Sequence, residues 1–213
     1  GEGPRWHEGK FYFSDFYSHK VFSLDMDGNS EVITEVPGQP SGLGWMPDGT
    51  MLIVSMKDKK LLGFIDNTLS EVADLSDLAG FHCNDMVVDD YGNAYIGNFG
   101  FNTYSGEEIK PANLILVRPG EDPCVAADNL LFPNGAVITP DGKTLIVGET
   151  YAARLTSFDI NQDATLSNRR VWADFTLDAN EGNVPIPDGM CLDAEGAIWV
   201  ASPATAEVIR VKE

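Results

Sequence analysis

One phrase recurs five times along the chain: a short apolar run, a turn that carries an acidic residue and a glycine, and a second apolar run. Each copy predicts a β-hairpin, because the runs have the length and composition of strands and glycine permits a tight turn. Repeats of this length are typical of propellers and solenoids. The turn glycines, which follow one another after 40, 43, 50 and 54 residues, are Gly9, Gly49, Gly92, Gly142 and Gly196.

Further strand-like runs follow each hairpin, such as VFSLDM with EVITEV and LTSFDI with RRVWADF. About four strands in every 40 to 50 residues is the signature of a propeller blade, so we expect an all-β fold of the β-propeller type. A β-sandwich is the alternative all-β fold, but it would not repeat the same hairpin five times. Five blade repeats are visible and the fifth fades at VIRVKE, so either the ring is five-bladed or the chain is part of a longer one.

The charge narrows the choice of partners. The formal net charge is −19, with 33 acidic against 14 basic residues. A field of this sign repels phosphate backbones and anionic lipids, so nucleic acid and membrane surfaces are poor candidates and a small molecule is the better one. The acidity either keeps the protein soluble or serves a cation site.

The cysteines and the apolar runs bear on location. Cys83, Cys124 and Cys191 lack the spacing of a metal clip and cannot all pair with one another, which favours a reducing compartment. No signal peptide and no apolar run of membrane-spanning length is visible. We therefore expect a cytoplasmic protein.

The same position in every repeat carries an oxygen-bearing side chain. In a propeller blade the first strand lies nearest the central axis, so the starts of all first strands converge on one mouth of the central channel. The residue just before that strand lies seven or eight positions ahead of the turn glycine. We call these five the slot residues: Glu2, Ser41, Asn84, Asn134 and Asp188.

Four slot residues can bind a metal ion: Glu2, Asn84, Asn134 and Asp188. Two carboxylates and two carboxamides suit Ca²⁺, which takes 6–8 oxygen ligands and would keep places for water and substrate. Zinc prefers His and Cys, although Zn²⁺, Mg²⁺ and Mn²⁺ remain alternatives. Ser41 is expected to face the channel without binding the ion. The competing interpretation is that the Asn-Gly and Asp-Gly pairs only form turns.

These segments also resemble a known family. The stretches EGPRW, CNDMVVD, FPNGAVITPDG, SNRRVWADF and PDGMCLDAEGAIWVA resemble the SMP-30/gluconolactonase/LRE-like family of regucalcin-like lactonases, and the resemblance covers essentially all 213 residues. It implies a six-bladed propeller with a divalent metal ion in its channel. Residues 1–213 would then be a single propeller domain, incomplete at both ends, with further strands before Gly1 and after Glu213.

The resemblance also implies roles for single residues. Glu2 in EGP, Asn134 in PNG and Asp188 in PDG match the metal ligands of the family. Asp188 also matches the proposed general base, and Asn84 in CND matches an Asn that contacts the metal or the substrate. Sugar lactonases of the family often carry an Arg two residues before that Asn, where this chain has His82, which speaks against a sugar acid as the substrate.

Loops at the same mouth are expected to form a substrate wall. The connections that end each second strand and those that join the blades reach this mouth, including residues 178–187, and the longest, residues 98–111, is a candidate lid. Phe99, Phe101, Tyr104 and Tyr151 would make the wall aromatic, and His82 is the histidine we expect to contact substrate. His7 and His19 are expected to be solvated turn residues, and Cys83 a small buried one.

Together these features predict a calcium-dependent hydrolase that opens a small lactone, such as a sugar lactone, to a hydroxy acid. The ion would polarise the carbonyl, and Asp188 would take a proton from the attacking water. Chemistry alone leaves a second option, in which the ion itself acidifies that water. The alternative functions are a phosphotriesterase-like hydrolase, similar to the diisopropyl-fluorophosphatase type, and a non-catalytic calcium-binding propeller.

Overall fold

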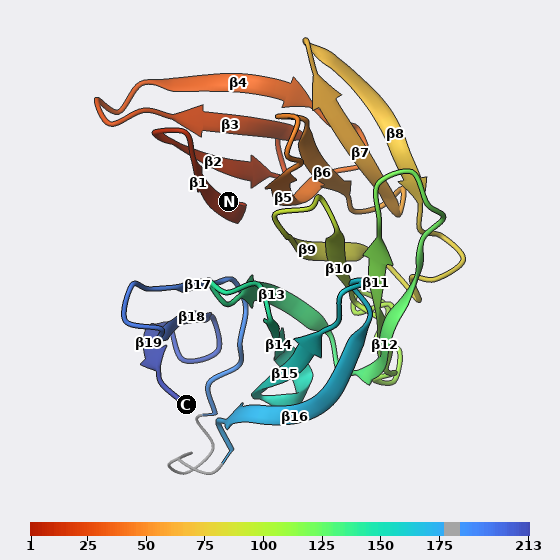
Figure 1. Cartoon of the computed structure of the whole chain (residues 1–213), viewed down its shortest axis with the longest axis vertical. Coiled ribbons are helices and arrows are strands. Elements are labelled where there is room, and N and C mark those ends of the chain that lie inside the picture. The colour runs from red at the N-terminus through yellow and green to blue at the C-terminus, as the bar shows by residue number, and fades with distance from the viewer. Residues whose placement is uncertain (177–183) are drawn as a thin grey trace.

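The computed structural model describes residues 1–176 and 184–213, and it is an all-β propeller of five blades, as the repeat predicts (Figure 1). Blades 1 to 4 are four-stranded antiparallel sheets and blade 5 has three strands. In Figure 1 the blades follow one another around a common centre, with blade 1 and blade 5 at the two ends of the arc. No helix in the described part of the chain has the length and apolar character needed to cross a bilayer.

The strands follow the repeat from the centre outward. Blade 1 contains β1 (Glu2–His7), β2 (Lys10–Asp15), β3 (Lys20–Leu24) and β4 (Ser30–Glu35), and blade 2 contains β5 (Pro40–Trp45), β6 (Met51–Ser55), β7 (Lys60–Ile65) and β8 (Thr68–Asp74). Blade 3 contains β9 (Cys83–Val88), β10 (Ala94–Asn98), β11 (Ala112–Val117) and β12 (Cys124–Leu130). Blade 4 contains β13 (Pro133–Ile138), β14 (Thr144–Glu149), the short 3-10 helix η1 (Thr150–Ala152), β15 (Arg154–Ile160) and β16 (Leu166–Asp174), and blade 5 contains β17 (Met190–Leu192), β18 (Ile198–Ser202) and β19 (Glu207–Val211).

The hydrophobic core lies between neighbouring blades. The innermost strands contact one another in the order β1, β5, β9, β13, β17. Because side chains alternate across a strand, each sheet offers one apolar face to the blade before it and one to the blade after it. Blades 2 and 3, for example, enclose Val54, Leu61, Met86 and Ile96, all of which are fully buried. This packing fixes the inner strands, which carry the slot residues.

A register irregularity and a glycine shape the start of the inner strands. The pairing of β5 with β6 shifts between Pro40 and Leu43, and that of β13 with β14 shifts between Pro133 and Ala136, so a bulge falls where each slot residue stands. The glycine that follows admits the next blade's backbone: a Cβ on Gly42 would lie 2.5 Å from Met86 N. In blades 2 and 4 the bulge and the close approach together bring the slot residue to the channel mouth, whereas an added Cβ on Gly189 of blade 5 would meet no described atom within 4 Å.

Candidate metal centre and substrate pocket

All five slot residues line one pocket of about 230 Å³ at the mouth where the inner strands begin. Each of the five blades therefore supplies one oxygen-bearing side chain to the same space. Asn84 and Asn134 are buried, and Ser41 is 2% exposed. The convergence that the repeat predicts is present, and it joins residues that lie up to 186 positions apart in the chain (Glu2 to Asp188).

Hydrogen bonds connect the slot residues of blades 4 and 5. Asn134 Nδ2 donates to Asp188 Oδ1 at 2.8 Å and to Thr150 Oγ1 at 3.3 Å. Thr150 Oγ1 in turn donates to Pro187 O at 2.7 Å. Asp188 precedes β17, yet its backbone N–H donates to Ala201 O of β18 at 3.0 Å. Asn134 thus holds one oxygen of the Asp188 carboxylate, and β18 holds the Asp188 backbone.

The carboxyl groups of the pocket carry unfavourable negative charge. Burial, and then the nearby charges of Asp188 and Asp85, raise the pKa of Glu2 to about 7. Burial also raises the pKa of Asp188, with Asp85 adding to the rise, while the hydrogen bond from Asn134 opposes it. Burial and like charges thus make the ionised form of these carboxyl groups unfavourable. A cation that enters the pocket would stabilise that form.

The donor set of the pocket fits a hard cation. The described residues contain no cluster of three or more His, Cys, Asp or Glu side chains that could hold a metal ion, so a site here would need the amide oxygens of the slot residues as well. The four candidate ligands are two carboxylates and two carboxamides, which matches the oxygen preference of Ca²⁺. Cys83, beside Asn84, is fully buried, and burial raises the pKa of its thiol to about 12, as expected for a small buried side chain.

An ion pair that the repeat does not predict lies next to the slot residues. Asp85 stands where the other four blades carry glycine after the slot residue. Its buried carboxylate accepts a hydrogen bond from Arg5 Nη2 at 2.9 Å, and Arg5 also donates to Met86 O. In the sequence, the Asp in place of glycine marks position 85 as unusual. Nothing in the sequence marks Arg5, 80 positions away, as its partner.

A second set of equivalent residues forms the wall of the pocket. The first residue after the second strand of every blade lines it, and we call these the collar residues. Counting seven positions forward from the turn glycine, or eight in blade 4, would have found them in the sequence. They are Phe16, Met56, Phe99, Thr150 and Pro203.

The remaining wall residues come from loops. Phe132, just before β13, and Tyr104, in the loop after β10, also line the pocket. Tyr151 and His82 do not. Tyr151 packs its ring edge against Phe132 with centroids 5.2 Å apart, and His82 stacks on Phe81 at 4.0 Å. Both therefore stand behind the wall. Phe101 is buried in the same cluster.

The three histidines lie in different surroundings. His82 Nδ1 is buried without a hydrogen-bond partner among the described residues, and burial lowers the pKa of this imidazole. His7 and His19 are both half-buried: His7 stacks on Trp45 with centroids 4.1 Å apart, and His19 Nδ1 lies 2.8 Å from Pro37 O, so neither is a fully solvated turn residue. Of the connection 178–187, residues 178–183 lie outside the described residues.

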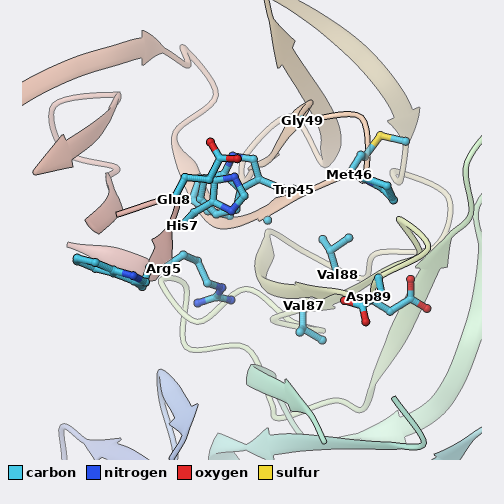
Figure 2. A pocket seen from close by; sticks show the side chains of 14 residues that line it. Arg5, His7, Glu8, Trp45, Met46, Gly49, Val87, Val88 and Asp89 are labelled. Atoms are coloured by element: carbon cyan, nitrogen blue, oxygen red, sulfur yellow. The ribbon is translucent and has the colours of Figure 1, made fainter. Parts of the chain in front are cut away.

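A larger pocket, of about 460 Å³, lies at the opposite mouth, where the first and second strands of the blades turn (Figure 2). In Figure 2 His7 and Trp45 lie on one side of it and Val87 and Val88 on the other. None of the slot residues lines this pocket. The slot residues are therefore confined to the smaller pocket.

Comparison with known proteins agrees with this architecture. Regucalcin of Xenopus laevis is 27% identical over 99% of this chain and 71% of its own length. Lactonase drp35 of Staphylococcus epidermidis is 25% identical over 95% of this chain and 62% of its own length. The crystal structure of regucalcin from Agrobacterium tumefaciens, described as a calcium-binding protein, superposes with a TM-score of 0.80 at 25% identity, covering 99% of this chain and 70% of that one.

The family model of the SMP-30/Gluconolactonase/LRE-like region matches residues 1–213, which is the whole chain. This match, together with the five-bladed fold and the relatives above, assigns the protein. The chain belongs to the SMP-30/gluconolactonase/LRE-like family.

Proposed function

We propose that the protein is a calcium-dependent hydrolase that opens a small lactone to a hydroxy acid in the pocket of the slot residues. The observation that carries the proposal is the convergence of one oxygen-bearing side chain from each blade on a single pocket whose carboxyl groups repel one another. Glu2, Asn84, Asn134 and Asp188 would hold the ion. A non-catalytic propeller has no need of such a ring together with an open, partly apolar pocket above it.

Relatives support the chemistry. One is a lactonase and another a regucalcin whose structure is described as that of a calcium-binding protein. Ca²⁺ is the ion that these donors fit best, with Mg²⁺, Mn²⁺ and Zn²⁺ as the alternatives to test. When bound, such an ion acts as a Lewis acid toward the lactone carbonyl and offsets the charge that develops on its oxygen.

The chain's own residues supply positioning and proton transfer. Asp188 is the proposed base toward the attacking water, because its carboxylate lines the pocket and could bind the ion with one oxygen while the other orients water. Asn134, bonded to Asp188, orients that carboxylate. Asn84 lines the same pocket and is the proposed contact to the substrate or the ion. His82 and Tyr151 support the wall from behind, through Phe99 and Phe132.

The test is a hydrolysis assay on lactones and on a phosphotriester, using protein treated with a chelator and then refilled with single metal ions. We expect lactone opening to disappear with the chelator and to return with Ca²⁺. Turnover of the phosphotriester in preference to every lactone would replace the proposal by the phosphotriesterase alternative. Calcium binding seen by calorimetry without turnover of either class would make the protein a calcium-binding propeller.

A further inference from the structure

We propose that the pocket selects lactones that carry an apolar substituent and disfavours polyhydroxylated ones. The inference rests on the proposed function and adds a substrate class to it. It is carried by the two layers of the pocket: the slot residues make a polar base, and the collar residues make a wall that is apolar in four blades out of five. A lactone placed with its carbonyl at the base would present its ring substituent to the collar.

The collar is built into the repeat. Phe16, Met56, Phe99 and Pro203 each follow directly on the last residue of a second strand, so four blades send an apolar side chain into the pocket from the same structural position. Thr150 is the exception. Its hydroxyl is bonded to Pro187 O and receives a bond from Asn134, so it belongs to the network of the base rather than to a set of free donors on the wall.

Phe132 extends the apolar wall and has an unfavourable backbone conformation. Its φ of 59° is in the left-handed region, which a bulky side chain rarely adopts. Two hydrogen bonds hold it there: Thr150 N donates to Phe132 O at 3.2 Å, and Leu131 N donates to Glu149 Oε2 at 2.8 Å. Glu149 is itself fully buried and paired with Arg154. Strained residues of this kind concentrate at binding sites, where the surroundings hold them.

Aromatic packing makes the wall rigid. Phe99 and Phe132 stack with centroids 4.4 Å apart and an interplanar angle of 25°. Behind them, Phe101 and Tyr151 pack edge-on at 5.4 Å. A wall held in this way cannot readily turn a polar group toward a substrate.

The wall also offers few partners to hydroxyl groups. Among the described residues that line the pocket, none is Lys, Arg or His, and the Tyr104 hydroxyl is the only polar group of the wall beyond Thr150. The hydroxyls of a sugar lactone would lose their bonds to water against these rings, which is unfavourable, whereas an alkyl or aryl group would gain from leaving water. The pocket therefore favours lactones with an alkyl or aryl substituent over sugar lactones.

The experiment compares three δ-lactones that share one reacting ring: δ-valerolactone, δ-decalactone and glucono-1,5-lactone. Their kcat/KM values are measured with the calcium-loaded protein after subtraction of spontaneous opening. The alkyl chain should raise kcat/KM over the polyol by on the order of 10²-fold. Binding of the matching δ-lactams, which are not opened, is measured by calorimetry and should follow the same order.

Phe132→Asn tests the wall directly, because Asn tolerates the left-handed backbone while removing the ring. It should lower kcat/KM for δ-decalactone by roughly tenfold and change that for δ-valerolactone by less than about threefold. Tyr91→Asn is the matched control, since Tyr91 is 80% exposed and is not part of the pocket. It should change neither value.

The outcomes separate this inference from the proposed function. Lactam affinities that favour the alkyl chain, without opening of any lactone, would overturn the lactonase and support the apolar preference. Opening of glucono-1,5-lactone at least as fast as δ-decalactone would keep the lactonase and overturn the preference. An equal effect of Phe132→Asn on both δ-valerolactone and δ-decalactone would also overturn it.

Discussion

Arg5 of blade 1 and Asp85 of blade 3 form an ion pair with Nη2 2.9 Å from Oδ1, although their blades are not neighbours in the ring. The Asp85 carboxylate is only 6% exposed, and Arg5 also donates to the backbone of β9 at Met86 O. The pair thus crosses the channel beside the slot residues and connects two blades that otherwise meet mainly through blade 2. It also offsets one of the three negative charges gathered there.

Removal of the Arg5 charge should lower the free energy of unfolding. Arg5→Met leaves the Asp85 carboxylate buried without its partner, which typically destabilises a protein by about 3–5 kcal/mol. Asp85→Asn in the same chain should restore much of that loss, because the buried charge is then gone. Urea unfolding of the two single variants and the double variant gives the coupling energy directly. A loss below about 1 kcal/mol for Arg5→Met would contradict a structural role for the pair.

Replacement of Gly135, the glycine after the slot residue in blade 4, should destabilise the fold. A Cβ on Gly135 would overlap Asp188 O, to which Gly135 N donates a hydrogen bond, and would lie 2.9 Å from Met190 N. We expect Gly135→Ala to lower the free energy of unfolding by about 2–3 kcal/mol and to disturb Asp188. In blade 5 the equivalent glycine, Gly189, has no described atom within 4 Å of an added Cβ. Gly189→Ala is therefore the control, expected to lie within about 0.5 kcal/mol of the parent, and equal losses would refute the close-approach argument.

The raised pKa of Glu2 makes stability depend on pH in a defined direction. The folded chain holds this proton up to a pKa of about 7, against an ordinary glutamate pKa of 4.5. Between these values the folded state binds more protons than the unfolded state, so the free energy of unfolding falls as pH rises, by no more than about 3 kcal/mol. Urea unfolding with chelator at pH 5 and pH 8 measures the loss. Glu2→Gln should flatten the profile, and saturating Ca²⁺ should restore stability at pH 8.

Much of the fold was predictable because its signals are local. A β-hairpin is specified by two runs and a turn glycine within about 15 residues, so the five hairpins of the repeat are present in the structure where the sequence places them. The slot residues followed from the same register, since the start of every inner strand reaches the same mouth. Only Asp188 lies before its strand as expected, whereas the other four are the first or second residue of theirs. The fold class and the convergence of Glu2 with Asp188 thus needed only the repeat and the topology of a propeller.

Features that depend on contacts between distant side chains were not predictable. The Arg5–Asp85 pair joins residues 80 positions apart, and a charged residue in place of glycine does not name its partner. Likewise, the sequence placed Tyr151 and His82 at the pocket because their loops reach it, but side-chain direction puts both behind other aromatic rings. The loop position was visible in the sequence, whereas the direction of each side chain depends on the packing around it.

Asp188 is the residue whose substitution best distinguishes binding of the ion from chemistry. Asp188→Asn keeps the size and one oxygen of the side chain but removes the basic carboxylate. We expect calcium to bind more weakly and kcat for lactone opening to fall by roughly 10²-fold or more even at saturating metal. Glu2→Gln should instead raise the calcium concentration needed for activity more than it lowers kcat. Tyr91→Asn, at an exposed residue that does not line the pocket, is the control and should leave both values nearly unchanged.

Titration of calcium against activity for all three variants separates the roles of these residues, because affinity shifts the midpoint and chemistry lowers the plateau. The expected result is a lowered plateau for Asp188→Asn and a shifted midpoint for Glu2→Gln. The bond from Asn134 Nδ2 to Asp188 Oδ1 keeps the carboxylate in place for the transfer of a proton. A normal plateau for Asp188→Asn would remove Asp188 as the base. The activation of water would then have to come from the ion, and Asp188 would be a ligand alone.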